Sequence, residues 1–491
     1  DVPDRRRGVL LRGWVIQAGR YAQGIYLPEA PLRINGTLTQ HPTHLHEYFF
    51  ALRQDQAGGQ PGPAITGGFD LRHLTVHAKL GQFTLDPQHG SLLPHELRQW
   101  WDRFQPQGSL PVVSFSYDDP AAGAGFRAHI SVEGVNLTLP YGEAPTGMTD
   151  VSGTFDIHNQ RVETSLSGYF EDMQYHIDGR IDGFSRDAPF VLTVRAPAFH
   201  LPAEPRYLLA LPPFVQRQFA KLSPTGTFDA DVTIRRDGTG EEIRYDGTVK
   251  LTDGTLLYEK FAYPLQDVEG TIRFDNEEIN IDQLSARGET GAVVLITGVI
   301  TPPGKDSAVS LTITAEDLPI DSVLYDAMPS YAVKVIEAFG DKAAYARLID
   351  EGLLQSRAQY DDRAAQLDAW TAQREQLAAE AAPDAQLVEE LDRQIEQMRF
   401  EMTQPVFDIG GTTKVTADVN RPYGPGRRYD ITTTIDMTGL NMIFRHWPYP
   451  MRLTGGELVV EPDLVEVREV TATGLRGGEG RLTGKVLLDR D

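Results

Sequence analysis

Three histidines and a glutamate stand close together near the N-terminus: the motif HPTHLHEY contains His41, His44, His46 and Glu47. Imidazole nitrogens and carboxylate oxygens are common ligands of zinc and related transition metals. His44 and His46 would share one face of a strand, because side chains alternate along it. The motif comes without a further ligand or a second cluster, so we expect a solvated loop edge and no metal site.

Other chemically suggestive residues have plainer interpretations. The run GLRGGEG at 474–480 is rich in glycine, but no P-loop lysine follows it and it falls in an expected hairpin. The acid pairs at 118–119 and 277–278 stand at expected turns, with no partner that would raise a pKa. No set of nucleophile, base and oxyanion donors can be assembled. We therefore expect no catalytic residues, no cofactor and no enzyme.

The chain contains an internal repeat. Residues 254–298 align with residues 440–484 without a gap, at an offset of 186. Tyr263 falls on Tyr449, and Gly270 falls on Gly456. The aromatic side chains of these segments favour either core packing or the lining of an apolar path, with core packing the default: Tyr258, Phe261, Tyr263, Phe444, Trp447 and Tyr449. Such a repeat replaces a count of globular domains with a quasi-linear array.

Weaker copies of the pattern surround Gly36 and Gly153. Gly36, Gly153 and Gly270 are spaced by 117 residues, and the next interval, 186, is 117 plus 69, so it must hold an insertion. The residues at 93–108 likewise align with those at 211–226. This second alignment predicts one short amphipathic helix per unit. A third copy of the helix segment begins at Met328. The predicted organisation is a partial β repeat (1–73), two whole repeats (74–190 and 191–308), a third repeat (309–340 and 403–491) and an insertion (341–402).

Between the predicted helices, apolar and polar residues alternate. Phe126, Ile130 and Val132, for example, are separated by polar residues such as His129 and Ser131. This alternation predicts half-buried antiparallel strands with one apolar face. A helix about 10 Å wide cannot cover a face of about seven strands, roughly 30 Å broad. Either two sheets pack face to face as a sandwich, or the apolar face stays open and binds a hydrophobic ligand.

The insertion at 341–402 has a helical pattern instead. Its apolar residues recur every three or four positions on both sides of Pro383, which predicts an antiparallel helical hairpin of the coiled-coil type. The fold class that we expect is mainly β: an elongated, curled antiparallel β-sheet groove built from repeats of about 117 residues with one short helix each, plus this inserted hairpin.

Composition restricts the ligands. With 69 acidic and 46 basic residues, the chain has a net charge of -23, which argues against nucleic acid and against adsorption onto anionic lipid surfaces. No stretch approaches 18 consecutive apolar residues, and there is no cysteine. The first and last residues of the sequence fall in the middle of a repeat. We expect a segment of a longer protein whose membrane anchor lies elsewhere.

The run YEKFAYPLQDVEGTIRFDNEEINIDQLSAR, the later DLPIDSVLYDAMP and the element LPPFVQRQFAKLSPTG together resemble the AsmA-like repeat family, which includes AsmA, TamB and YhdP. The resemblance covers most of residues 74–340 and 405–491 and rests on a repeated pattern, not on a catalytic signature. It implies a bacterial bridge-like lipid transport protein, anchored in the inner membrane and reaching across the periplasm of a double-membrane bacterium. The helical insertion departs from the family pattern.

On this interpretation an apolar groove carries phospholipids between the inner and outer membranes and serves outer-membrane lipid homeostasis. The acyl chains would contact a diffuse lining: Phe126, Ile130, Val132, Val232, Ile234, Tyr245, Val249, Ile272, Phe274, Ile281, Val294, Ile296 and Leu311. The alternative is a structural scaffold of the envelope, in which closed sheets form a sandwich and the hairpin at 341–402 docks a protein partner.

Overall fold

The computed structural model describes most of the chain. The described residues are 8–16, 32–55, 61–85, 101–102, 104–118, 125–139, 146–171, 173–185, 187–201, 213–259, 261–328, 333, 337, 340–379, 384–445 and 447–487. The chain divides into two compact units. Unit 1 comprises residues 1–220, 224–253 and 271–279, and unit 2 comprises 221–223, 254–270 and 280–491.

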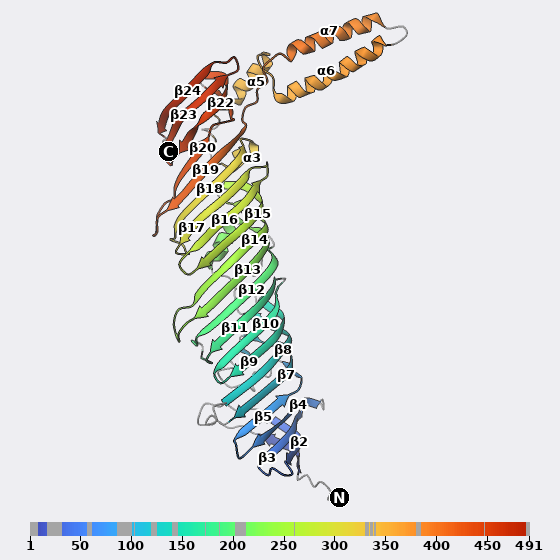
Figure 1. Ribbon diagram of the computed structural model, residues 1–491, viewed down its shortest axis with the longest axis vertical. Coiled ribbons are helices and arrows are strands. Elements are labelled where there is room, and N and C mark those ends of the chain that lie inside the picture. The colour runs from blue at the N-terminus through green and yellow to red at the C-terminus, as the bar shows by residue number, and fades with distance from the viewer. Residues whose placement is uncertain are drawn as a thin grey trace. The chain divides into compact units, whose positions relative to one another are not determined.

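Unit 1 is an antiparallel sheet in which strands that follow each other in sequence lie side by side (Figure 1), except that β5 and β6 both pair with β7. Among its described residues, no pairing joins the first strand to the last, so this sheet is open. Its strands are β1 (Gly8–Ile16), β2 (Leu32–Gln40), β3 (Glu47–Asp55), β4 (Pro61–Asp70), β5 (Thr75–Leu80), β6 (Phe83–Leu85), β7 (Gln107–Asp118), β8 (Gly125–Leu139), β9 (Thr146–His158), β10 (Arg161–Phe170), β11 (Met173–Asp182), β12 (Phe190–Leu201) and β13 (Thr225–Arg236).

Unit 2 contains a second run of antiparallel strands. They are β17 (Val293–Thr301), β18 (Ala308–Pro319), β19 (Thr412–Arg421), β20 (Asp430–Asp436), β21 (Asn441–Phe444), β22 (Trp447–Val460), β23 (Leu464–Gly474) and β24 (Glu479–Leu487). The boundary between the units runs through or beside three further strands: β14 (Arg244–Tyr258), β15 (Phe261–Asp275) and β16 (Ile279–Gly288).

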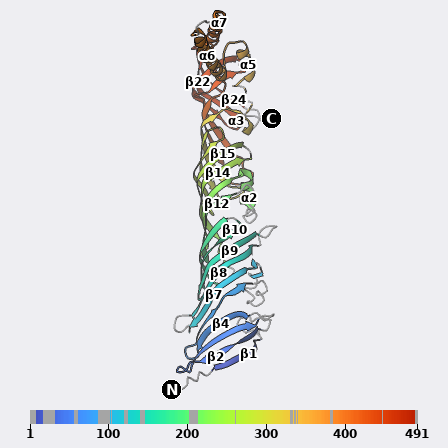
Figure 2. The ribbon, with the colours of Figure 1, turned by 90° about the vertical axis from the view of Figure 1, so that its right-hand side faces the viewer.

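Helices are few. α2 (Pro213–Leu222) confirms the helix predicted within 211–226. Most of the helices predicted at 93–108 and from Met328 lies outside the described residues. α3 (Ser322–Ala327) begins at its N-cap Asp321, whose side chain accepts a hydrogen bond from the Leu324 N–H. Figure 2 shows α3 on one face of the strands of unit 2.

Within unit 2, β18 and β19 are separated by α5 (Lys342–Asp350), α6 (Arg357–Ala378) and α7 (Ala385–Glu401). Ser356 and Gln359 form a capping box at the start of α6, and Asp384 caps α7. α6 and α7 contact each other along their length (Figure 1), with an ion pair of 3.0 Å between Arg374 Nε and Asp392 Oδ1. No described residue of α6 is buried, whereas three residues of α7 at helical spacing are: Leu391, Ile395 and Met398.

Buried polar side chains link the start of α6 to the residues that follow α7, and we call this region the base of the two helices. Gln355 is 0% exposed, and its side-chain amide donates to the carbonyl oxygens of Met402 at 3.3 Å and Gln404 at 2.7 Å. Its side-chain oxygen accepts a 2.7 Å bond from Arg363. Asp408 lies beside it, 3.1 Å from the N–H of Arg357.

Tyr345 of α5 completes this base. Its hydroxyl lies 3.0 Å from Asp408 Oδ1 and 3.0 Å from the carbonyl oxygen of Phe407. Burial, together with the hydrogen bond to Asp408, raises the pKa of Tyr345 above its ordinary value. These bonds satisfy the polar groups where the chain leaves and re-enters the sheet.

The glycines that mark the sequence pattern lie where strands approach closely. Gly153 has φ +146°, and a Cβ there would come within 2.0 Å of the Ser165 carbonyl oxygen; Gly270 has φ +148°, with 2.1 Å to the oxygen of Gln283. Only glycine meets both demands.

The strands and their pairing confirm, within each unit, the prediction of a mainly β chain with open antiparallel sheets.

Candidate functional site: the apolar face of the sheet

One face of unit 1 carries mostly apolar side chains, in rows that cross the strands. Directly opposed residues of an antiparallel pair point to the same face. One row crosses from β7 to β13: Val113, Ile130, Phe155, Thr164, Gly179, Leu192 and Ile234. The next row, two residues along, is Val132, Gly153, Leu166, Ile177, Val194 and Val232. The structure thus brings four of the predicted lining residues onto one face: Ile130, Val132, Val232 and Ile234.

The opposite face of the same strands is charged. Arg195 Nη1 lies 2.9 Å from Asp178 Oδ2, and Arg195 Nε lies 3.3 Å from Asp231 Oδ2. His129 Nδ1 lies 2.6 Å from Asp156 Oδ1. Exposed pairs of this kind contribute about 1 kcal/mol or less each, so they identify the solvent side and are not the main source of stability.

Unit 2 repeats this two-sided arrangement. One row is Val294, Ala315, Val415, Ile435, Leu458 and Val467, and the next is Ile296, Ile313, Ala417, Thr433, Val460 and Val465. Leu311 is opposite Gly298 and joins the same face. On the other face, Lys414 pairs with Glu316 at 2.9 Å, and Thr312 donates to Asp418. Val294, Ile296 and Leu311 therefore share a face, as the interpretation requires.

The remaining predicted lining residues lie on β8 and on the strands near the unit boundary. The rings of Tyr245 and Phe274, both in unit 1, are 6.2 Å apart. Phe274 covers Gly247, because a Cβ there would lie 2.7 Å from its ring. By strand alternation Val249 shares the face of Tyr245, and Ile272 that of Phe274. Phe126 stands opposite Tyr117. Ile281 belongs to unit 2 and is half-buried.

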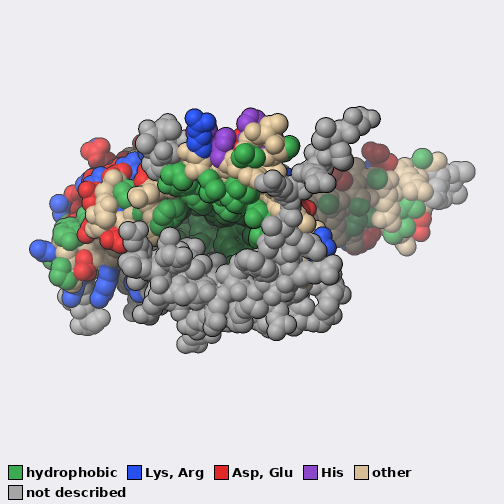
Figure 3. All heavy atoms as spheres, turned by 90° about the horizontal axis from the view of Figure 1, so that it is seen from below, with side chains coloured by type: hydrophobic (Ala, Val, Ile, Leu, Met, Phe, Trp, Pro, Cys, Tyr) green, Lys and Arg blue, Asp and Glu red, His purple; other side chains and the backbone are tan. Residues whose placement is uncertain are grey.

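The exposure of these side chains distinguishes an open face from a sandwich core. Of the thirteen residues, Val132 and Val294 are buried at 9% and 5%, Phe126 is 37% exposed, and the other ten are half-buried. A second protein layer would bury such residues almost completely. Seen from the N-terminal end, the molecule has a hollow lined by hydrophobic side chains (Figure 3).

Parts of the apolar face are covered. In unit 1, Val132, Val135 and Val151 form a packed cluster with Leu85, against which Trp101 also packs. In unit 2, Leu324 and Ala327 of α3 belong to a buried cluster against which Ala315 and Val415 pack. The short elements therefore cover the face locally.

At β22 and β23 the face is closed. Leu458, Val465 and Val467, which continue the rows of unit 2, are 5%, 4% and 8% exposed. They pack in one core with residues of and around β21, among them Leu440 and Met442. The half-open portion of unit 2 therefore lies on β17 to β20.

The predicted aromatic residues differ in exposure. Tyr263 is 4% exposed and covers Gly288, and Tyr449 covers Gly474 in the same way, 186 residues later. Their stacked neighbours are solvent-accessible: Phe261 is 39% exposed and Trp447 is 61% exposed. Tyr263 is thus a core residue, Tyr449 is half-buried, and the outer rings lie at the surface.

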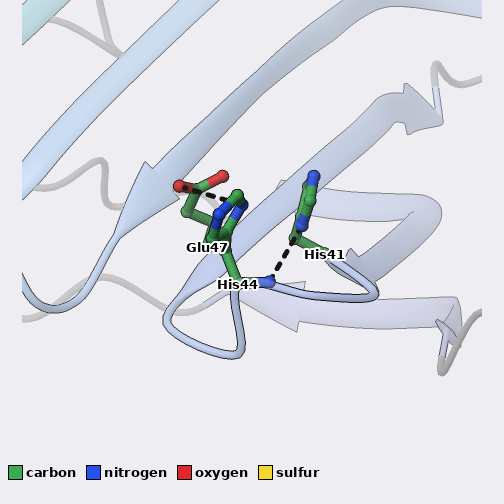
Figure 4. A group of neighbouring side chains, drawn as sticks. All are labelled: His41, His44 and Glu47. Atoms are coloured by element: carbon green, nitrogen blue, oxygen red, sulfur yellow. Dashed lines mark hydrogen bonds and ion pairs between the residues drawn. The ribbon is translucent and has the colours of Figure 1, made fainter.

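The histidine motif has neighbours that sequence reasoning missed. Asp70 and His73, from the turn between β4 and β5, lie beside His46, with 3.7 Å between His46 Nε2 and Asp70 Oδ2. His41, His44 and Glu47 form an adjoining group (Figure 4). The signal was available only through strand pairing, which sets Glu47 opposite Asp70.

Asp70 is held as a carboxylate. Desolvation opposes its ionisation, but hydrogen bonds from the His73 side chain and from the backbone N–H groups of Arg72 and His73 lower the pKa of Asp70 to about 2. The 2.6 Å contact therefore joins an acceptor oxygen to a His73 Nδ1–H donor.

Of the other chemically suggestive residues, Asp118 ends β7, and Glu277 and Glu278 lie in the turn before β16. Asp275 Oδ1 accepts the N–H groups of Glu277 and Glu278, which lowers the pKa of Asp275. The glycine-rich run at 474–480 connects β23 to β24, as predicted. Asp119 lies outside the described residues.

Comparison with protein-family models, curated proteins and solved structures gives no match for this chain, so function is argued from its residues and geometry. None of the helices among the described residues has the length and apolar content needed to cross a membrane.

Proposed function

We propose that this chain is part of a lipid conduit, in which the apolar face of the sheet shields phospholipid acyl chains while the charged face contacts water. The observation that carries the proposal is the half-buried state of largely apolar rows across adjacent strands, interrupted only by threonine and glycine. Single exposed hydrophobic residues are common on proteins, but continuous apolar surface of this kind marks a binding surface.

The physical consequence is weak and unspecific binding. Each methylene transferred from water to an apolar surrounding gains about 0.8 kcal/mol, so a chain with about ten methylenes in contact gains on the order of 8 kcal/mol relative to water. Relative to the interior of a bilayer, which is equally dry, the gain is close to zero. A lipid whose chains are more stable on this face than in water, but no more stable there than in a membrane, can move from row to row.

The family, the repeat architecture and the location of the protein are part of the same proposal. We assign the chain to the AsmA-like bridge-type proteins, built from repeats of about 117 residues with an inserted helical hairpin, and acting between the inner and outer membranes from the periplasm. The equivalent pairs Tyr263–Gly288 and Tyr449–Gly474, 186 residues apart, support the repeat. No catalytic role or cofactor is part of the proposal.

The test places a charge on the apolar rows. Ile130→Asp, Ile234→Asp and Ile296→Asp, combined in one chain, would set carboxylates where acyl chains are to lie. We expect the variant to lose most of its co-purified phospholipid, measured by mass spectrometry, and to compromise the outer membrane when it replaces the native protein.

The matched control is Ser131→Asp, Thr233→Asp and Thr297→Asp, because each residue is adjacent in the same strand and points to the opposite face. This control should keep both its lipid and its function. Circular dichroism must show both variants folded; if the first set unfolds, Ile→Asn at the same sites replaces it. Equal lipid content in the two folded variants would refute the conduit.

A second candidate function is a scaffold that docks a protein partner through α6 and α7. It is favoured by the exposure of these helices: Phe400 is 74% exposed and Leu387 is 41% exposed. The rigid base formed by Gln355 and Asp408 would hold such an arm in place. The two functions are compatible, since a conduit also needs to be positioned.

A further inference from the structure

We propose that the turns between β2 and β3 and between β4 and β5 form a binding site for a divalent transition-metal ion of the zinc class. His46, Asp70 and His73 are the ligand set, and His44 and Glu47 adjoin it. Six side chains with imidazole or carboxylate donors gather at this one edge of unit 1, the five named above and His41. A site of this kind would link two turns far apart in the sequence.

The backbone brings the two turns together. Glu47 begins β3 and stands directly opposite Asp70, the last residue of β4. The N–H of Leu71 donates to the carbonyl oxygen of His46 at 2.9 Å. Both turns are thus held by the sheet itself, and their side chains meet without any ion.

The spacing of the donor atoms fits one metal position. Two ligand atoms about 2.0 Å from a tetrahedral zinc ion lie about 3.3 Å apart. His46 Nε2 is 3.7 Å from Asp70 Oδ2 and 4.0 Å from Glu47 Oε1. One donor atom from each of His46, Asp70 and His73 lies within 4.8 Å of the others. Small side-chain rotations therefore close the set around an ion.

The hydrogen bonds favour His73 over His41 as a ligand. His73 Nδ1 lies 2.6 Å from Asp70 Oδ2, the same oxygen that is 3.7 Å from His46 Nε2, so an ion that displaces the proton between His73 and Asp70 would meet donors from all three residues. His41 Nδ1 instead accepts the N–H of His44 at 3.0 Å (Figure 4), so its other nitrogen carries the proton. His41 is assigned the role of shaping the turn.

The partial burial of the central residues also favours this trio. The side chains of Asp70 and His46 are 14% and 28% exposed, whereas those of His73 and His44 are 62% and 57% exposed, so burial holds Asp70 and His46, and His73 is held by its 2.6 Å contact with Asp70. Ligands held by the surrounding chain lose less conformational freedom on binding than free surface histidines do. The net charge of -23 further favours a cation.

The test uses the full chain, freed of any affinity tag and treated with a chelator. Titration with Zn²⁺ by calorimetry should show saturable binding, and Co²⁺ should give the visible absorption of a tetrahedral site. His46→Gln with His73→Gln should weaken Zn²⁺ binding by about tenfold or more. Zn²⁺ should also raise the melting temperature of the native chain, and the chelator should reverse this rise.

His158→Gln with His200→Gln is the matched control, because it removes two exposed imidazoles from β9 and β12 of the same unit. This control should bind Zn²⁺ like the native chain. The proposal fails if the native chain shows no saturable binding, if both double variants bind equally, or if His41→Gln with His44→Gln abolishes binding while the His46–His73 variant retains it.

Discussion

Tyrosines that cover glycines stabilise the sheet at single positions. Tyr175 of β11 stands opposite Gly168 of β10, and a Cβ on that glycine would lie 2.7 Å from the tyrosine hydroxyl. Tyr263 and Tyr449 cover Gly288 and Gly474. The ring fills the space that the missing side chain leaves, so these pairs bury apolar area across neighbouring strands.

The hydroxyl of Tyr175 predicts an unusual response to mutation. Tyr175 is 2% exposed, and its hydroxyl has no hydrogen-bond partner among the described residues, whereas that of Tyr263 lies 3.3 Å from Thr290 Oγ1. Tyr175→Phe should therefore leave stability unchanged or raise it by about 1 kcal/mol, and Tyr263→Phe should lower it slightly. Urea denaturation measures both.

The pH dependence of folding stability provides a second test of the buried Tyr175 hydroxyl. Burial raises the pKa of Tyr175 to about 12, so the native state holds this proton more tightly than the unfolded state does. Its contribution is complete below about pH 10 and is lost as the pH rises through 12. Tyr175→Phe should remove that part of the alkaline loss. A larger stability loss for Tyr175→Phe than for Tyr263→Phe would contradict the assignment.

At the scale of elements, the base of α6 and α7 depends on a few buried polar groups. Gln355 makes three side-chain hydrogen bonds, to Met402, Gln404 and Arg363, while 0% exposed. Leaving buried partners unpaired costs more than the bonds themselves contribute. These polar groups act together with the apolar cluster of Ala344, Leu354, Phe407 and Ile443, which packs α5 against β21.

Gln355→Leu should therefore loosen the two helices. We expect a loss of about 2 kcal/mol and faster amide exchange in α5, α6 and α7, with little change in β17 to β20. Gln366→Leu, at an exposed position of α6, is the control and should change neither. Equal exchange in the two variants would show that the cluster does not hold the helices.

At the scale of the whole molecule, each unit has one apolar and one charged face, and the helices α6 and α7 add a separate surface. The two candidate functions assign activity to different parts. The conduit needs the apolar rows, and the scaffold needs the helices.

Replacing residues 357–401 by a short Gly-Ser linker separates these functions. The ends of the deleted segment are close, because the N–H of Gln355 donates to the Pro405 oxygen at 3.0 Å. We expect co-purified lipid to persist in the folded variant, measured by mass spectrometry. Retained lipid with lost function in the cell would assign docking to the helices, and lost lipid would show that they belong to the lipid path.

Much of this architecture was predictable from the amino-acid sequence. Alternation at Ile130 and Val132 predicts strands with one apolar face, because successive side chains of a strand point to opposite sides. Apolar spacing of three and four predicts the helices that contain Trp370 and Leu391. Gly153 and Gly270 mark close strand approaches, because no other residue type fits there. These are local properties, and local sequence carries them.

Only the tertiary structure decided which residues meet. Strand register aligns Ile130 with Ile234 through four intervening strands and sets Glu47 opposite Asp70, which turns a histidine motif into a candidate metal site. It also decided that the apolar face is half-open on β17 to β20 and closed at β22 and β23. Register and burial depend on contacts between residues far apart in the chain, and a pattern read along the sequence does not contain them.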